Sequence, residues 1–148
     1  MPKVITTIDI SATPEKVWNI ISDMEKYPQF MSDLVEVKVL ERGNNTTKTH
    51  WVAKAKNMTV EWDEEDFYYP EEFRIYYKAQ QGVFSKFEGE WRITPKDNEK
   101  IEVSLSVDFE IGVPMFRTLL GPLATKLIKD NCEMMLRGVK ERAESNDS

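Results

Sequence analysis

Cysteine and histidine, a common nucleophile and base, occur once each in this chain, as Cys132 and His50. Alternation places His50 on the polar face of a predicted strand with Lys48 and Lys54, and helical spacing places Cys132 on the flank of a predicted helix. A hydrolytic relay requires its base within hydrogen-bond distance of the nucleophile. The pattern therefore favours a solvent-exposed histidine and predicts no nucleophile pair.

The acidic run Asp63-Glu64-Glu65-Asp66 is a candidate metal site. Zinc sites use His and Cys at short spacings, and a calcium loop needs a glycine and a turn. The run stands at the end of a predicted strand, where side chains alternate between faces, so we assign it to a solvated strand end. The six glycines are scattered singly, which leaves no phosphate-binding loop. We expect neither a metal nor a cofactor.

Aromatic and apolar side chains form a second candidate site, for a hydrophobic small molecule. The predicted ligand-binding residues are Trp51, Trp62, Phe73, Tyr77, Phe87 and Trp91 on strands, and Phe116, Leu120, Leu123, Leu127, Asn131 and Met134 on the last helix. These positions fit a filled core. They also fit a cavity, because one helix about 10 Å across does not fill the concave side of about seven curved strands. Trp51, Tyr77 and Asn131 carry the polar groups available to orient a ligand, although Asn131 equally fits a buried amide.

The elements that must position these side chains follow from periodicity. Residues 3–10 alternate as a strand, and Thr13-Pro14 predicts the start of a helix that ends near Asp23. Tyr27-Pro28 permits one more short helical turn. Residues 114–143 return to helical spacing. The sequence therefore predicts two short helices after the first strand and one long helix at the end.

The segment between these helices has a period of two. From Leu34 to Phe109, apolar residues alternate with Lys, Glu, Arg, Asp and Ser, and Val35, Val37 and Val39 are assigned to the dry face of the first of these strands. This alternation is typical of antiparallel strands with one buried face, about seven in all. A kink or restart is expected in the last helix at Gly121-Pro122. The fold class is α+β.

Composition limits the function classes. The 148 residues fit a single domain over 1–148, with 144–148 as a frayed tail. The net charge of −6 disfavours nucleic acid as a partner, and no apolar run is long enough to cross a bilayer. A single cysteine and the absence of a signal-peptide pattern at residues 1–11 predict a cytoplasmic protein.

Hairpin parity places three turns at one end of the sheet, together with the start of the last helix. These turns lie at residues 56–57, 81–82 and 111–114. The residues predicted to form a cavity mouth there are Met58, Val83, Phe84, Val113 and Met115, within a collar of Lys54, Lys56, Lys78 and Lys86. Such an apolar rim fits ligand entry or a transient membrane contact, and it equally fits a plug at the end of the core.

Four motifs together resemble the START-like helix-grip superfamily, in particular its polyketide cyclase and coenzyme-Q-binding group. They are Tyr27-Pro28-x-Phe30, Gly82-x-Phe84, Gly89-x-Trp91-x-Ile93-x-Pro95 and Asp108-Phe109. The resemblance covers nearly the whole chain. It implies a curved antiparallel sheet wrapped around the C-terminal helix, with a cavity for an apolar molecule. The proline and cysteine expected after Phe30 in the quinone and toxin branches are absent.

Three functions stay open on this basis. The first is binding or transport of a lipid, quinone or polyketide-like molecule in the cavity. The second is an enzyme of the cyclase, aromatase or dehydratase type, with Tyr77 as the candidate acid and Asn131 as a polarising amide. The third is a protein-interaction role like that of the ribosome-association toxin branch, which the acidic net charge disfavours.

Two glycines interrupt good apolar patterns at dry-face positions. Gly89 lies in a strand and Gly138 lies in the last helix. Glycine at such positions usually marks a bend or a close approach of two backbones. We expect the sheet to bend at Gly89, and we expect Gly138 to face another element, for which the helix of Trp18 is the candidate.

Overall fold

The computed structural model describes residues 3–55, 58–80, 84–112 and 114–145. Side chains are described for these residues except at positions 55, 58, 80 and 114–120. The predicted side chains of Met58, Met115, Phe116 and Leu120, and all of Val83 and Val113, therefore lie outside the described part of the chain.

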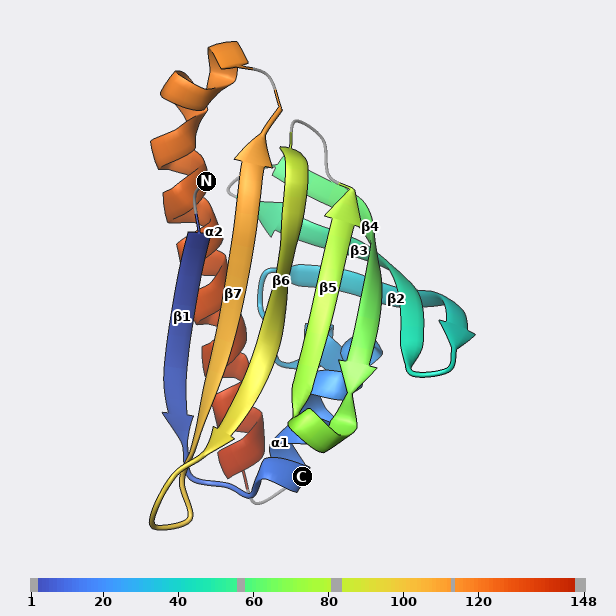
Figure 1. The fold of residues 1–148 in the computed structure, drawn as a ribbon, viewed down its shortest axis with the longest axis vertical. Coiled ribbons are helices and arrows are strands. Elements are labelled where there is room, and N and C mark those ends of the chain that lie inside the picture. Colours follow the sequence, from blue (N-terminus) through green and yellow to red (C-terminus); the bar gives the residue numbers. More distant parts are fainter. Residues whose placement is uncertain (1–2, 56–57, 81–83, 113, 146–148) are drawn as a thin grey trace.

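Seven antiparallel strands form a single curved sheet (Figure 1). They are β1 (Lys3–Ile10), β2 (Leu34–Gly43), β3 (Thr46–Ala55), β4 (Met58–Tyr69), β5 (Arg74–Gln80), β6 (Phe84–Pro95) and β7 (Ile101–Ile111). Their order is β1-β7-β6-β5-β4-β3-β2, so the first and second strands form the two edges. The α+β helix-grip architecture predicted from the sequence is confirmed.

Helices cover one face of this sheet, which we call the inner face. They are α1 (Pro14–Ser22), the 3-10 helix η1 (Met24–Gln29) and α2 (Pro114–Glu144). A second 3-10 helix, η2 (Pro70–Glu72), connects β4 to β5 and has no buried residue. The α1 N-cap is as predicted, because Thr13 Oγ1 accepts the Lys16 N–H at 3.2 Å and Pro14 occupies the first turn. Of the kink or restart expected at Gly121-Pro122, the restart does not occur, since α2 runs through Pro122 as one helix.

The start of β2 differs from the predicted alternation. Leu34 is buried, whereas Val35, assigned to the dry face, is 51% exposed. The pairing of β2 with β3 shifts register between Leu34 and Glu36. A bulge adds one residue to a strand and moves the following side chains to the other face, which explains why the period of two fails there.

α2 packs most closely against β1, β7 and α1, and in Figure 1 it runs behind β1 and β7. The expected close approach at Gly138 is confirmed, because a Cβ there would lie 2.3 Å from the Phe30 carbonyl oxygen. The partner, however, is the end of η1 rather than the helix of Trp18. A Cβ at Gly89 would lie 1.8 Å from the Ser106 carbonyl oxygen, so the two backbones converge there too.

Candidate functional site

Four aromatic rings meet on the inner face of the sheet. Trp51 and Trp62 face each other across β3 and β4 and stack with ring centroids 5.6 Å apart. Tyr27 of η1 packs its edge against Trp51 at 5.6 Å and against Trp91 of β6 at 5.9 Å. Trp51, Trp91 and Tyr27 are buried, but Trp62 is only half-buried. Trp62 therefore forms the open side of the ring cluster.

The acidic run beyond Trp62 is only partly the solvated strand end that was predicted. Asp63 and Glu65 are exposed, but Glu64 is 7% exposed and Asp66 is fully buried. β4 continues to Tyr69, so the alternation that turns Trp62 inward also turns Glu64 and Asp66 inward. The assignment of these two carboxyl groups to solvent is wrong.

Asp66 is held by hydroxyl groups from the neighbouring strand. Thr47 and Thr49 of β3 donate to Asp66 Oδ2 at 2.9 and 2.8 Å, and Trp51 Nε1 donates to Thr49 Oγ1 at 2.8 Å. Asp66 Oδ1 is buried and has no hydrogen-bond partner among the described residues. A buried carboxylate oxygen without a donor is costly, so a proton or a cation is expected beside it.

Glu64 lies beside Asp66 and accepts a hydrogen bond from Trp62 Nε1 at 3.1 Å. Burial, followed by the hydrogen bond to Asp66 and by the charge of Asp66, raises the pKa of Glu64 well above its usual range. Two carboxyl groups this close share a proton more readily than they both ionise. Glu64 therefore holds its proton to a higher pH than an exposed glutamate does.

The other titratable groups around this pair stay neutral at ordinary pH. Burial raises the pKa of Tyr27 and Tyr77 well above the usual range, and it raises the pKa of Tyr68 to about 12. The pKa of Cys132 on α2 is raised by burial to about 12. Tyr27, Tyr68 and Tyr77 interact with Glu64 or Asp66 from η1, β4 and β5, and each of them holds its proton more tightly than an exposed tyrosine does.

The structure divides the predicted strand residues of the site into three groups. Trp51, Trp62 and Trp91 meet in the ring cluster. Phe87 packs with Phe84 at 5.2 Å, toward the predicted mouth. Phe73 packs its edge against Trp18 of α1 at 6.2 Å, next to η2 at the opposite end of the sheet.

The predicted residues of α2 differ in burial along the helix. Met134 is buried and Asn131 and Leu127 are half-buried, while Leu123 is 47% exposed. The side chains of α2 are therefore more deeply buried near Met134, and their burial decreases toward Leu123.

The hydroxyl group of Tyr77, the candidate acid, is hydrogen-bonded to the backbone. Its hydroxyl donates to the Ser106 carbonyl oxygen at 2.7 Å. Because burial also raises its pKa well above the usual range, this hydroxyl holds its proton rather than delivering it. The structure therefore points to Glu64, not Tyr77, as the polar group able to exchange a proton on the inner face.

At the predicted mouth, Phe84 is half-buried and packs its edge against Phe109 at 5.7 Å. Lys86 of the expected basic collar forms ion pairs with Glu88 at 3.6 Å and Asp108 at 3.3 Å. These acidic neighbours reduce the positive charge of the collar at Lys86.

His50 lies on the outer face, as predicted, between two carboxylates. Its Nδ1 is 2.6 Å from Asp63 Oδ1 and its Nε2 is 3.0 Å from Glu61 Oε1. The hydrogen bonds to Asp63 and then to Glu61 raise the pKa of His50. No group of three or more potential metal-binding side chains occurs among the described residues.

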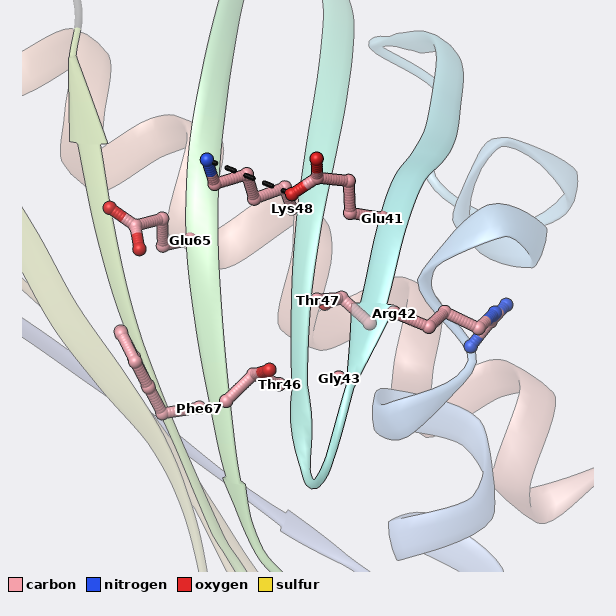
Figure 2. Close-up of a pocket in the computed structure, with 8 residues that line it drawn as sticks. All are labelled: Glu41, Arg42, Gly43, Thr46, Thr47, Lys48, Glu65 and Phe67. Atoms are coloured by element: carbon pink, nitrogen blue, oxygen red, sulfur yellow. Dashed lines mark ion pairs between the residues drawn. The ribbon is translucent and has the colours of Figure 1, made fainter.

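A surface pocket of about 200 Å³ lies at the β2–β3 hairpin (Figure 2). Its walls carry mixed charges, and Lys48 and Glu41 form an ion pair across it at 3.7 Å. Thr47 is the one lining residue that also belongs to the hydroxyl pair on Asp66. The pocket is therefore separate from the ring cluster.

The raised pKa of Glu64 predicts a specific pH dependence of stability. The folded protein retains a proton that the unfolded chain releases above about pH 4.3, so the contribution is fully present below that pH and is lost as pH rises through the folded pKa. Each pH unit crossed in this window lowers the unfolding free energy by about 1.4 kcal/mol. Glu64→Gln removes this loss, so urea unfolding from pH 5 to 8 should show a flatter profile than the parent.

Glu65→Gln is the matched control, because Glu65 is the exposed neighbour on the outer face. Its profile is expected to run parallel to that of the parent. A Glu64→Gln profile that also runs parallel to the parent would show that Glu64 is ionised in the folded protein.

Comparison with known proteins agrees with this architecture. A model of the family described as polyketide cyclase / dehydrase and lipid transport matches residues 10–136. A Thermus thermophilus crystal structure is 31% identical and superposes with a TM-score of 0.89, covering 99% of this chain and 100% of that one. The Zhui aromatase/cyclase of a Streptomyces species is 19% identical, with a TM-score of 0.89 over 97% of this chain and 93% of that one.

A curated relative is the ribosome association toxin RatA of Escherichia coli. It is 23% identical over 146 residues, which cover 95% of this chain and 89% of the toxin. In the described part of the chain, no helix has the length and apolar character needed to span a membrane.

The seven-stranded curved sheet, the long C-terminal helix and the match over residues 10–136 all lead to one assignment. The chain belongs to the polyketide cyclase / dehydrase and lipid transport family and has its START-like helix-grip fold.

Proposed function

We propose that the protein binds a hydrophobic small molecule, such as a lipid, a quinone or a polyketide-like aromatic, between the inner face of the sheet and α2. The supporting observation is the incomplete cover of Trp62, which stacks on a buried ring yet remains half-buried itself. Phe87 on β6 and Leu127 on α2 are half-buried as well. Apolar side chains of this kind are typical of the lining of a ligand site.

Burial of apolar surface supplies the affinity in this proposal. Each Å² removed from water contributes about 25 cal/mol, so a ligand that covers about 200 Å² of ring surface gains about 5 kcal/mol before the costs of association. Trp62 contributes most, because one face of its ring is already fixed by Trp51. A flat or chain-like apolar ligand is therefore the class that fits.

Titration with oleate, a short-chain ubiquinone and a naphthol tests the proposal, with tryptophan fluorescence and native mass spectrometry as readouts. At least one of them is expected to bind saturably. Trp62→Leu should then weaken binding about tenfold, through loss of ring contact. Trp18→Leu is the control, because Trp18 packs on Phe73 away from the ring cluster. The absence of saturable binding to all three compounds would contradict the proposal.

A cyclase or dehydratase is the second candidate, and the protonated Glu64 carboxyl favours it. A neutral acid on an apolar wall can deliver a proton to a leaving hydroxyl group. Mass spectrometry of bound material separates the two candidates, since a binding protein returns its ligand unchanged and an enzyme returns a product.

A ribosome-associated role is disfavoured by the charge of the chain. The net charge of −6 opposes contact with a phosphate backbone.

A further inference from the structure

The buried carboxyl pair lacks a basic partner. Glu64 and Asp66 lie on the inner face, and none of the ion pairs among the described residues joins a Lys, Arg or His to either of them. Buried charges in proteins are normally paired. Neither carboxyl group therefore forms an ion pair with a cationic side chain in the described part of the chain.

Asp66 has one oxygen that the neighbouring Glu64 carboxyl is placed to serve. Thr47 and Thr49 both donate to Asp66 Oδ2, whereas Oδ1 is buried with no hydrogen-bond partner among the described residues. In the unliganded protein, the proton shared with Glu64 is available to this oxygen. A proton at Asp66 Oδ1 fills the position that a cation would otherwise occupy.

The surroundings of Glu64 suit an organic cation. Trp62 donates to Glu64 Oε1 and stacks on Trp51, and the buried Tyr77 lies on the same inner face. Aromatic ring faces carry negative potential and attract ammonium groups. Glu64 retains 7% exposure whereas Asp66 has none, so Glu64 is the carboxyl group that a ligand can reach.

We infer that the preferred ligand is a lipophilic amine whose ammonium group binds Glu64 while its hydrophobic body covers Trp62. This inference rests on the proposed function and names its substrate class. The ammonium takes the place of the shared proton, which leaves to solvent. The buried pair then consists of two carboxylates and one ammonium, so its total charge is the same before and after binding.

This replacement of a proton by an ammonium group distinguishes the binding of amines from that of other ligands of the same shape. An alcohol can accept or donate a hydrogen bond at Glu64, but it carries no charge to replace the proton. A carboxylate adds negative charge beside Asp66 and is repelled. Charge-assisted hydrogen bonds are about twice as strong as neutral ones, so the amine is expected to bind about tenfold or more tightly than the alcohol.

Naphthylmethylamine, naphthylmethanol and naphthylacetate test this, because they share one ring system and differ at the end group. Calorimetry at pH 7 is expected to rank the amine first and the acetate last. Titrations in two buffers with different ionisation enthalpies should show release of up to one proton for the amine and none for the alcohol. Between pH 5 and 8 the amine affinity should rise with pH, because binding of the amine releases a proton. The tyrosines that interact with the pair, Tyr27, Tyr68 and Tyr77, have raised pKa values, and the charged groups acting on them from the N-cap of η1 and from β2 are Asp23 and Arg42.

Glu64→Gln isolates the carboxyl group. Its amide can still donate to Asp66 but cannot ionise, so the variant is expected to lose both the amine preference and the proton release. Glu65→Gln, on the outer face, should behave as the parent.

The outcomes separate this inference from the proposed function. Equal binding of amine and alcohol, or an amine preference that survives Glu64→Gln, overturns the inference and leaves hydrophobic binding in place. If none of the three naphthyl compounds binds, the inference is overturned directly. The proposed function fails with it only if oleate, the quinone and the naphthol also fail to bind.

Discussion

Gly89→Leu is expected to destabilise the protein by about 4 kcal/mol or more. Single substitutions cause a loss of this size only when they severely disrupt the core. A Cβ at this position would lie 1.8 Å from the Ser106 carbonyl oxygen and 2.7 Å from the Tyr77 hydroxyl. The nearest atom belongs to the backbone of β7, so relief requires movement of the strand itself. Thermal and urea unfolding measure the loss, and the same variant should bind ligand more weakly because the inner face is distorted.

Two further variants identify the cause. Gly89→Ala carries the same Cβ and should already lose most of the stability. Gly43→Ala is the control, since its Cβ would meet only the Thr46 hydroxyl oxygen, at 2.4 Å, and that side chain can rotate away. If Gly89→Leu has the same melting temperature and the same ligand affinity as the parent, β6 and β7 do not approach closely at this point.

Gly138→Ala is the second change with a large expected effect. Alanine normally stabilises a helix by about 1 kcal/mol relative to glycine. Here the added Cβ would lie 2.3 Å from the Phe30 carbonyl oxygen and 3.2 Å from its carbon. Overpacking against a backbone carbonyl outweighs the propensity gain, so we expect a net loss of about 1–3 kcal/mol in urea unfolding.

Gly121→Ala in the same helix provides the comparison. Among the residues whose side chains are described, no heavy atom other than its own chain neighbours and helix backbone lies within 4 Å of a Cβ there. Pro122 restricts the residue before it, which offsets part of the propensity gain, so the variant should stay within about 0.5 kcal/mol of the parent. A stabilising Gly138→Ala would mean that α2 and the end of η1 do not approach closely.

Periodicity alone was sufficient for the strands and helices, whereas the helix-grip arrangement followed from the family resemblance. The period of two between Leu34 and Phe109 and the helical spacing of residues 114–143 predict the sheet and α2, and Thr13-Pro14 predicts the start of α1. These signals are local, because a strand or helix that buries one face must repeat its apolar residues with its own period. They also place Trp51 and Trp62 on the inner face, as observed.

The central polar group of the site was accessible in principle. Counting by two from Trp62 leads to Glu64 and Asp66, but the strong charge of the run favoured a solvated strand end. Composition and alternation disagreed there, and alternation was correct because β4 continues to Tyr69. The signal was the phase of the strand, which does not depend on residue type.

What the tertiary structure decided is how distant segments meet. Thr47 and Thr49 reach Asp66 only through the register of β3 against β4, and a bulge in β2 turns Val35 outward. Gly138 faces the Phe30 carbonyl rather than α1 because the end of η1 crosses α2 there. Register and burial arise from non-local pairing, and a pattern of single residues along one strand or helix contains no information about the partner. The sequence by itself therefore determined the elements and their inner faces, while tertiary packing decided that the buried Asp66 is held by hydroxyl groups from the neighbouring strand.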